Sequence, residues 1–249
     1  MKDLRLLMGM PIWVEIVGEK AQRKHLDKIF EYFEKVEERF STFRETSEIS
    51  KYNLGVIKES EFSPEMKLIF KLAELTKFQT NGYFDIKRPN GEIDPAGIVK
   101  GWAIWEASKL IEKMGFENYF VDAGGDVQVK GKNSEGKDWR IGIRNPFNRE
   151  ENVKVVSIGN RGIATSGTYI RGQHVFDPHN PAKPIEEVVS ITVIGPNVYE
   201  ADRMATAALA MREKGVAFIA KLEEMEAYAI DHKGMATFTP GFNKFVIQA

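Results

Sequence analysis

The fold of this chain is best approached from the stretch Val198-Tyr199-Glu200-Ala201-Asp202-Arg203-Met204-Ala205-Thr206-Ala207. Residues 198–212 are rich in Ala, Met and Leu and hold no Gly or Pro, so they predict a helix. Residues four apart lie one above the other on a helix face, and Asp202 and Thr206 are so spaced. Their carboxylate and hydroxyl offer two hard oxygen ligands, the type that Mg²⁺ prefers. The same spacing is more often found on an exposed face or in a cap-like hydrogen bond.

Three further helices are expected upstream of this segment. Apolar residues recur at helical spacing over about residues 21–40. Ser63-Pro64 is a helix start with Pro at the first helical position, and Gly82 closes that helix near Asn81. A third helix is expected over residues 98–114, ending at Gly115.

The remaining pattern predicts strands rather than a regular alternation of strands and helices. The chain has no G-x-G-x-x-G loop, so a Rossmann fold is excluded. We expect an α+β fold of mainly antiparallel sheets with packed helices, in which residues 1–249 form one domain or two closely packed halves. The expected strands are residues 11–17, 119–121, 127–129, 139–143, 153–158, 190–194, 228–230 and 245–247, with one more helix at 216–225.

Composition excludes several classes of function. The 249 residues are 43% hydrophobic and 29% charged, which is typical of a globular chain able to bury a substantial core. A net charge of −1 gives no basic field for nucleic acid. The absence of Cys excludes disulfides, thiolate metal sites and a cysteine nucleophile.

The sequence leaves the compartment open between two cases. No apolar run approaches the length of a membrane span, and residues 1–8 have no signal-peptide core. We expect a cytoplasmic protein as the chain stands, or an exported or membrane-anchored one if a signal segment has been removed.

Six short segments use residue types that are costly choices for a plain scaffold. Glycine, proline, carboxylate and hydroxyl residues dominate them, and such residues often approach a ligand closely. The segments are Met8-Gly9-Met10-Pro11, residues 40–53, Asn81-Gly82-Tyr83-Phe84-Asp85, residues 93–101, Asp122-Ala123-Gly124-Gly125-Asp126 and residues 164–178.

Each segment also has a structural explanation. The 122–126 segment is a tight turn in most proteins, although its glycines would also let a phosphate or flavin ring approach. Asp94-Pro95-Ala96-Gly97 is ordinarily a cap and turn, yet with Lys100 it also brings charge and amide donors to a helix N-terminus. Thr165-Ser166-Gly167 is explained as a hydroxyl-rich turn, and His174 as a surface or core residue. The aromatic residues of these segments are most simply explained as core.

Taken together, in this order and at these distances, the segments resemble the ApbE family, whose members are FAD:protein FMN transferases. The resemblance runs from Met8 to about Met211. It implies a single α+β unit that binds FAD in a cleft and uses Mg²⁺ to cleave the pyrophosphate of FAD. The FMN half then goes to a threonine hydroxyl of an acceptor protein, such as a subunit of a flavinylated redox complex, and AMP leaves.

The resemblance also implies roles for particular residues. The metal ligands would be the carbonyl of Gly97, the carboxylate of Asp202 and Thr206. His174, which precedes an Asp-Pro pair, would be the base that accepts the threonine proton, a role that suits its ordinary pKa. Asp202 would also be catalytic through the metal. The FAD contacts would fall on Met8, Phe43, Tyr83, Phe84, Asp85, Asp94, Lys100 and Phe176.

This chain departs from the family pattern at three positions. Met10 stands where Thr is usual, Phe43 where Tyr is common, and Pro181 where Gly usually follows the Asp-Pro pair. Two alternative functions also stay open from sequence. Water could replace the threonine, which would make the protein an FAD pyrophosphatase releasing FMN and AMP. The protein could also bind FAD without catalysis, although a metal site at the pyrophosphate argues against simple storage.

Overall fold

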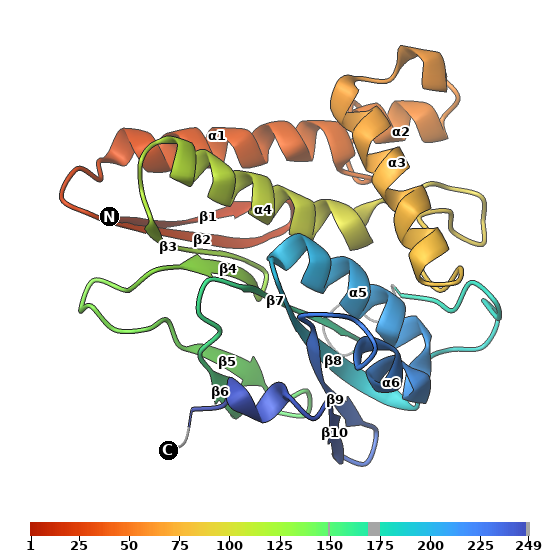
Figure 1. The fold of residues 1–249 in the computed structure, drawn as a ribbon. Helices are drawn as coiled ribbons and strands as arrows, with labels where there is room; N and C mark the ends of the chain where they lie inside the picture. Colours follow the sequence, from red (N-terminus) through yellow and green to blue (C-terminus); the bar gives the residue numbers. More distant parts are fainter. Residues whose placement is uncertain (149, 169–174, 248–249) are drawn as a thin grey trace.

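The computed structural model describes residues 1–148, 150–168 and 175–247. Within these ranges the core is an eight-stranded sheet in which all neighbouring strands are antiparallel (Figure 1). The strand order β1-β2-β3-β4-β7-β8-β9-β10 keeps the sequence order, with β5 and β6 set aside. The strands are β1 (Lys2–Leu7), β2 (Met10–Val17), β3 (Asn118–Ala123), β4 (Asp126–Lys130), β7 (Gly162–Gly167), β8 (Val188–Gly195), β9 (Glu226–Asp231) and β10 (Ala236–Phe238).

Helices cover one face of this sheet because strand residues alternate in direction and one set is apolar. Ile12, Val14 and Ile16 of β2 are fully buried, in the same apolar cluster as residues of α1, α3 and α4. The helix α5 packs on β7 and β8 and also against α4, so the helix layer is continuous (Figure 1). The helices are α1 (Arg23–Phe40), α2 (Glu48–Asn53), α3 (Pro64–Gln79), α4 (Ala96–Lys113), α5 (Val198–Ala210) and α6 (Gly215–Ile219).

A small second sheet covers part of the opposite face. It pairs β5 (Ile141–Arg144) with β6 (Asn152–Val156) and buries a separate apolar cluster against β4, β7 and β9. Trp139 packs on Phe120 of β3, with the ring centroids 5.4 Å apart. Leu4 of β1 and Trp13 of β2 line the cavity described below.

The sequence predicted most elements and their ends. The α+β class with antiparallel pairing is confirmed, and Ser63 caps α3 by accepting the Met66 N–H at 3.2 Å. The C-terminal stop of α4 is also confirmed, because Gly115 takes φ +88°, a conformation that favours glycine.

Several expected elements are wrong or were missed. The helix expected over 216–225 ends at Ile219, and the chain then turns, with Glu224 at φ +59°. The strand expected over 245–247 is absent from the described residues, where Val246 makes one isolated bridge to Val156 after a 3-10 turn at Phe242–Lys244. Thr165-Ser166-Gly167 is part of strand β7 rather than a turn. The missed strands and α-helices are β1, α2, β7 and β10.

The helices of the described ranges are too short or too polar for a membrane span.

Candidate functional site

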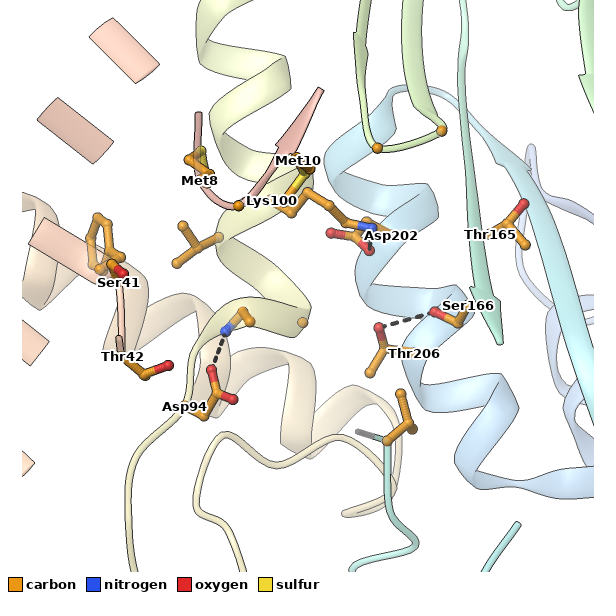
Figure 2. Close-up of a pocket in the computed structure, with 18 of the residues that line it drawn as sticks. Met8, Met10, Ser41, Thr42, Asp94, Lys100, Thr165, Ser166, Asp202 and Thr206 are labelled. Carbon is orange, nitrogen blue, oxygen red and sulfur yellow. Dashed lines mark hydrogen bonds and ion pairs between the residues drawn. The ribbon is translucent and has the colours of Figure 1, made fainter. Parts of the chain in front are cut away.

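A cavity of about 1210 Å³ opens where the N-terminal end of α4 meets α5, the β3–β4 turn and the loop after β1. Figure 2 shows Lys100 and Asp202 pointing toward one another near the centre of the cavity. Met8, Ser41 and Thr42 lie to the left of them in this view. All the site residues expected from sequence line the cavity, except one. His174 lies outside the described residues. The lining includes Met8, Phe43, Tyr83, Phe84, Asp85, Asp94, Gly97, Lys100, Phe176, Asp202 and Thr206.

The helix α5 presents Asp202 and Thr206 to the cavity from one face, as the four-residue spacing predicts. Asn197 begins this helix by accepting the Glu200 N–H at 2.9 Å. The Asp202 side chain is almost fully buried, and the Thr206 hydroxyl lies 3.3 Å from the Ser166 hydroxyl of β7 (Figure 2). The exposed-face explanation of this pair is therefore wrong.

Two glycines let α4 approach this face of α5. A Cβ atom on Gly101 would lie 2.6 Å from Asp202 Cβ and 2.8 Å from the Val198 carbonyl oxygen. A Cβ atom on Gly97 would lie 3.2 Å from Thr206 Cγ2. Gly97 has no positive φ, so the close approach of the helices, and not a special backbone conformation, accounts for this glycine. The Gly101 N–H donates to Asp202 Oδ2 at 2.8 Å, which fixes the carboxylate against α4.

Lys100 lies between two buried carboxylates. Its ammonium contacts Asp126 Oδ2 closely and lies 3.5 Å from Asp202 Oδ1. Burial raises the pKa of the Asp202 carboxyl above its ordinary value, and the Lys100 ammonium opposes that effect. Lys100 is expected from sequence to contact FAD, and the structure shows that its ammonium is also the counter-charge of Asp126.

The Asp122–Asp126 segment is a tight turn that also lines the cavity. Gly124 and Gly125 take φ of +63° and +99°, and the Gly125 N–H donates to Asp122 Oδ1 at 2.7 Å. Burial raises the pKa of Asp122 to about 6. Gly124 also backs onto Met10, since a Cβ there would lie 3.0 Å from Met10 Sδ. The tight-turn explanation of the segment is therefore confirmed, and the turn also forms part of the cavity wall.

Asp94 lies just before α4, whose N-cap residue is Pro95. The Oδ1 of Asp94 accepts the Ala96 N–H at 3.0 Å, and its Oδ2 contacts Arg88. The preceding residue, Ile93, is fixed by two hydrogen bonds to the Asn53 side chain. This side chain donates to the Ile93 carbonyl and accepts the Ile93 N–H, each at 2.9 Å. The segment is thus a turn that leads into α4, without a side-chain cap on Pro95, and the Asp94 carboxylate lines the cavity.

The four aromatic residues differ in burial. Phe84 is a core residue, 2% exposed, whereas Phe43 is 97% exposed at the cavity mouth. A core role for Phe43 is therefore wrong. Tyr83 packs edge-on against His179, with centroids 4.5 Å apart, and His179 Nε2 lies 2.9 Å from the Asn81 carbonyl oxygen. Phe176 is half-buried in the segment that follows the undescribed residues.

The departures from the family pattern are accommodated locally. Met10 is buried and replaces a polar side chain with packing against the β3–β4 turn. Pro181 is exposed within a regular turn, in which the Lys183 N–H donates to the Asn180 carbonyl at 3.1 Å. Neither change touches Asp202 or Thr206.

Sequence reasoning missed several residues that line the cavity. Trp13 and Phe120 come from the outer face of β2 and β3, where alternation alone gives no sign of a site. Three arginines add positive charge around the opening, which would favour a polyphosphate. They are Arg44, Arg88 and Arg144.

The donor set fits a hard divalent cation. The described residues contain no cluster of three or more His, Cys, Asp or Glu side chains able to hold a metal. Asp202, the Thr206 hydroxyl and the neighbouring Gly97 backbone instead provide one carboxylate and neutral oxygens, the ligand set that suits Mg²⁺.

Comparison with known proteins now places the chain. The ApbE family model matches residues 8–88 and 86–229. The chain belongs to the ApbE family. It is 32% identical over 178 residues to the FAD:protein FMN transferase of Escherichia coli K12, which covers 66% of this chain and 50% of that protein. The Klebsiella pneumoniae protein of the same name is 31% identical over 171 residues, covering 64% and 49%. The chain thus spans about half the length of the curated relatives it matches.

Solved ApbE structures share the whole fold. The flavin transferase ApbE of Vibrio cholerae superposes with a TM-score of 0.84 at 25% identity, covering 98% of this chain and 99% of that one. The ApbE protein of Thermotoga maritima gives a TM-score of 0.88 at 21% identity, covering 100% and 99%. The latter likeness concerns the fold alone.

Proposed function

We propose that this ApbE family member transfers FMN from FAD to a threonine hydroxyl of an acceptor protein, in the presence of Mg²⁺, and releases AMP. The observation that carries this proposal is the meeting of the Asp202–Thr206 face of α5 with Gly97 of α4 inside one large cavity. The name FAD:protein FMN transferase, borne by relatives at 30% identity or more, supports it. We further propose that residues 1–249 act as one domain and that the acceptor is a subunit of a redox complex.

Mg²⁺ would be held by Asp202, Thr206 and the Gly97 carbonyl. When bound, Mg²⁺ supplies charge neutralisation and Lewis-acid activation at the pyrophosphate. The protein contributes a fixed carboxylate, since the Gly101 N–H holds Asp202 Oδ2 at 2.8 Å. It also contributes a buried setting, where interactions between charges are stronger than in water.

FAD would lie across the cavity with its pyrophosphate at the N-terminal end of α4. The helix dipole, Lys100 and the arginines at the opening favour phosphate charge there. Phe43, Tyr83 and Phe176 offer aromatic faces for the flavin and adenine rings. Phe84, being buried, would shape the wall of the cavity rather than stack freely.

In the transfer step, the acceptor threonine oxygen attacks the phosphorus of the FMN half. A threonine O–P bond forms while the bond from that phosphorus to the bridging oxygen breaks, and AMP leaves with the bridging oxygen. His174 would accept the threonine proton, an assignment that rests on sequence. Because attack at a phosphorus flanked by negative oxygens depends on position and charge neutralisation, the fixed groups of the cavity matter more than covalent catalysis.

The test is an acceptor-dependent assay. Protein, Mg²⁺ and FAD are incubated with and without a protein that carries a target threonine. AMP and flavin fluorescence bound covalently to the acceptor are measured. We expect labelling that requires both acceptor and Mg²⁺. Release of free FMN and AMP without acceptor labelling would identify an FAD pyrophosphatase. FAD binding without AMP release would identify a binding protein.

A further inference from the structure

Asp126 is a buried carboxylate to which the proposed reaction assigns no role. It begins β4 and is 1% exposed, and it contacts the ammonium of Lys100. We propose that Asp126 is a positioning residue, which holds the Lys100 ammonium away from Asp202 and so keeps Asp202 available to a divalent cation. This inference rests on the metal site of the proposed function.

Asp126 is fixed more firmly than the lysine that it holds. Its Oδ1 accepts the Thr165 N–H of β7 at 3.0 Å. The ladder between β4 and β7 pairs Gln128 with Gly162 and Val127 with Ile163, and the side chain of Asp126 continues the contact beyond that pair. A carboxylate tied to two strands in this way is a rigid anchor for a flexible ammonium group.

The Lys100 ammonium is shared unequally between its two carboxylate partners. It contacts Asp126 Oδ2 closely, whereas Asp202 Oδ1 is 3.5 Å away (Figure 2 shows Lys100 and Asp202). Asp202 Oδ2 is already occupied by the Gly101 N–H. Oδ1 is therefore the oxygen for which an ammonium and a metal ion would compete.

Removing the charge of Asp126 would change this balance. Of the two ion pairs that Lys100 makes with carboxylates of the described residues, the one with Asp126 would be lost and the one with Asp202 would remain. The attraction between opposite charges in a buried setting is strong, so the ammonium would move onto Asp202. When both carboxyl groups are ionised, Asp126, Lys100 and Asp202 together carry one net negative charge, which favours a cation. Lys100 and Asp202 alone are neutral, which does not.

The experiment measures Mg²⁺ binding by calorimetry, without FAD, in a double-mutant cycle of Asp126→Asn and Lys100→Met. Asn retains an oxygen that can accept the Thr165 N–H, so the substitution removes mainly charge. We expect Asp126→Asn to weaken Mg²⁺ binding about tenfold or more. Adding Lys100→Met to that variant should restore the affinity to within about threefold of wild type, a larger gain than Lys100→Met gives in the wild-type background.

Glu200→Gln is the matched control. It also removes a negative charge from an ion pair beside the site, but Glu200 pairs with Arg203 and does not line the cavity. Its Mg²⁺ affinity should stay close to that of wild type. A loss as large as that of Asp126→Asn would mean that long-range charge, and not the position of the ammonium, sets the affinity, and would overturn the proposal.

The other outcomes are also decisive. Wild-type affinity in Asp126→Asn, or the same gain from Lys100→Met in both backgrounds, overturns the role of Asp126. If Asp126→Asn is unstable, the double variant carries the test, because it removes the Asp126 carboxylate together with the ammonium that it pairs with. Affinity near wild type in that variant supports the proposal, and loss of binding overturns it. A wild-type protein that binds no Mg²⁺ would instead overturn the metal site itself.

Discussion

At the scale of single residues, Asp202 is the side chain on which the proposed chemistry most depends. Asp202→Ala should abolish Mg²⁺-dependent FAD cleavage, because it removes the charged ligand of the site. The fold should survive, since Asp126 still pairs with Lys100. AMP release measures the loss, and Asp202→Asn, which still accepts the Gly101 N–H, separates loss of charge from loss of that hydrogen bond. Near-normal AMP release from either variant at ordinary Mg²⁺ would contradict the assignment.

Substitution of Gly97 tests whether its main-chain carbonyl is a ligand of Mg²⁺. Gly97→Val should weaken Mg²⁺ and FAD binding together although no charge changes, because a side chain there meets Thr206 Cγ2 at 3.2 Å and Phe84 Cε2 at 3.4 Å. Gly97→Ala should have the same effect in weaker form. Titrations of Mg²⁺ and of FAD provide the measurement. Loss of FAD binding with unchanged Mg²⁺ affinity would show that Gly97 serves the nucleotide alone.

The raised pKa of Asp122 predicts that the stability of the fold depends on pH. Burial raises its pKa from 3.8 to about 6, although Arg144 and Lys100 oppose the shift and Asp126 adds to it. The folded state therefore binds the proton more tightly than the unfolded state, and the stability contributed by protonated Asp122 is lost as pH rises from about 4 to about 6. Asp122→Asn should then raise the free energy of unfolding at pH 8 by roughly 2 kcal/mol and have little effect at pH 4. Urea unfolding at both pH values checks this, and an equal change at both would exclude a titration effect.

At the scale of elements, the contact between α4 and α5 depends on Gly101. Gly→Ala inside a helix ordinarily gains about 0.5–1 kcal/mol. Here the new Cβ would overlap Asp202 Cβ at 2.6 Å, and forced overlap typically costs about 1–3 kcal/mol. Overlap should therefore outweigh helix propensity, so Gly101→Ala should lower the melting temperature by a few degrees and weaken Mg²⁺ binding. An increase in melting temperature would show that the two helices separate without cost.

The elements that sequence could predict are those with strong local signals. The Ser63-Pro64 start of α3, the apolar spacing of α1 and Gly115 after α4 act over a few residues each. Strand β1 could not be predicted because its apolar residues Leu4 and Leu6 are exposed rather than buried. The strand therefore has no alternation of buried apolar and exposed polar residues. Strand β7 was hidden by its Thr and Ser residues, which are held by pairing with β8.

The site residues, like the elements, divide into those that a local sequence signal predicts and those that only the packed structure shows. Asp202 and Thr206 could be placed together because one helix carries both, and the family pattern brought in the other segments. The pairing of Asp126 with Lys100 joins residues 26 positions apart on different elements, so only the packed structure shows it. Arg144 comes from the small second sheet, and no motif marks its approach to the cavity.

At the scale of the whole molecule, one sheet joins both ends of the chain. Its apolar clusters share strands, so we expect a single cooperative unfolding transition. FAD with Mg²⁺ should raise the melting temperature by about 5–10 °C at roughly a hundred times the dissociation constant. Differential scanning calorimetry measures both, with AMP-free buffer and chelator as the control. Two separate transitions would show that the halves are independent domains.

The contact between α4 and α5 also sets the order in which the molecule can be completed. Gly97 and Lys100 are synthesised roughly a hundred residues before Thr206, and sequential strands must be added between them. During translation the early helices therefore form without their partner, and the nascent chain has no complete place for a flavin nucleotide or an ion. FAD and Mg²⁺ would therefore not guide the first half of folding. Each would bind only after α5 has packed against α4, and so would stabilise only molecules whose fold is complete.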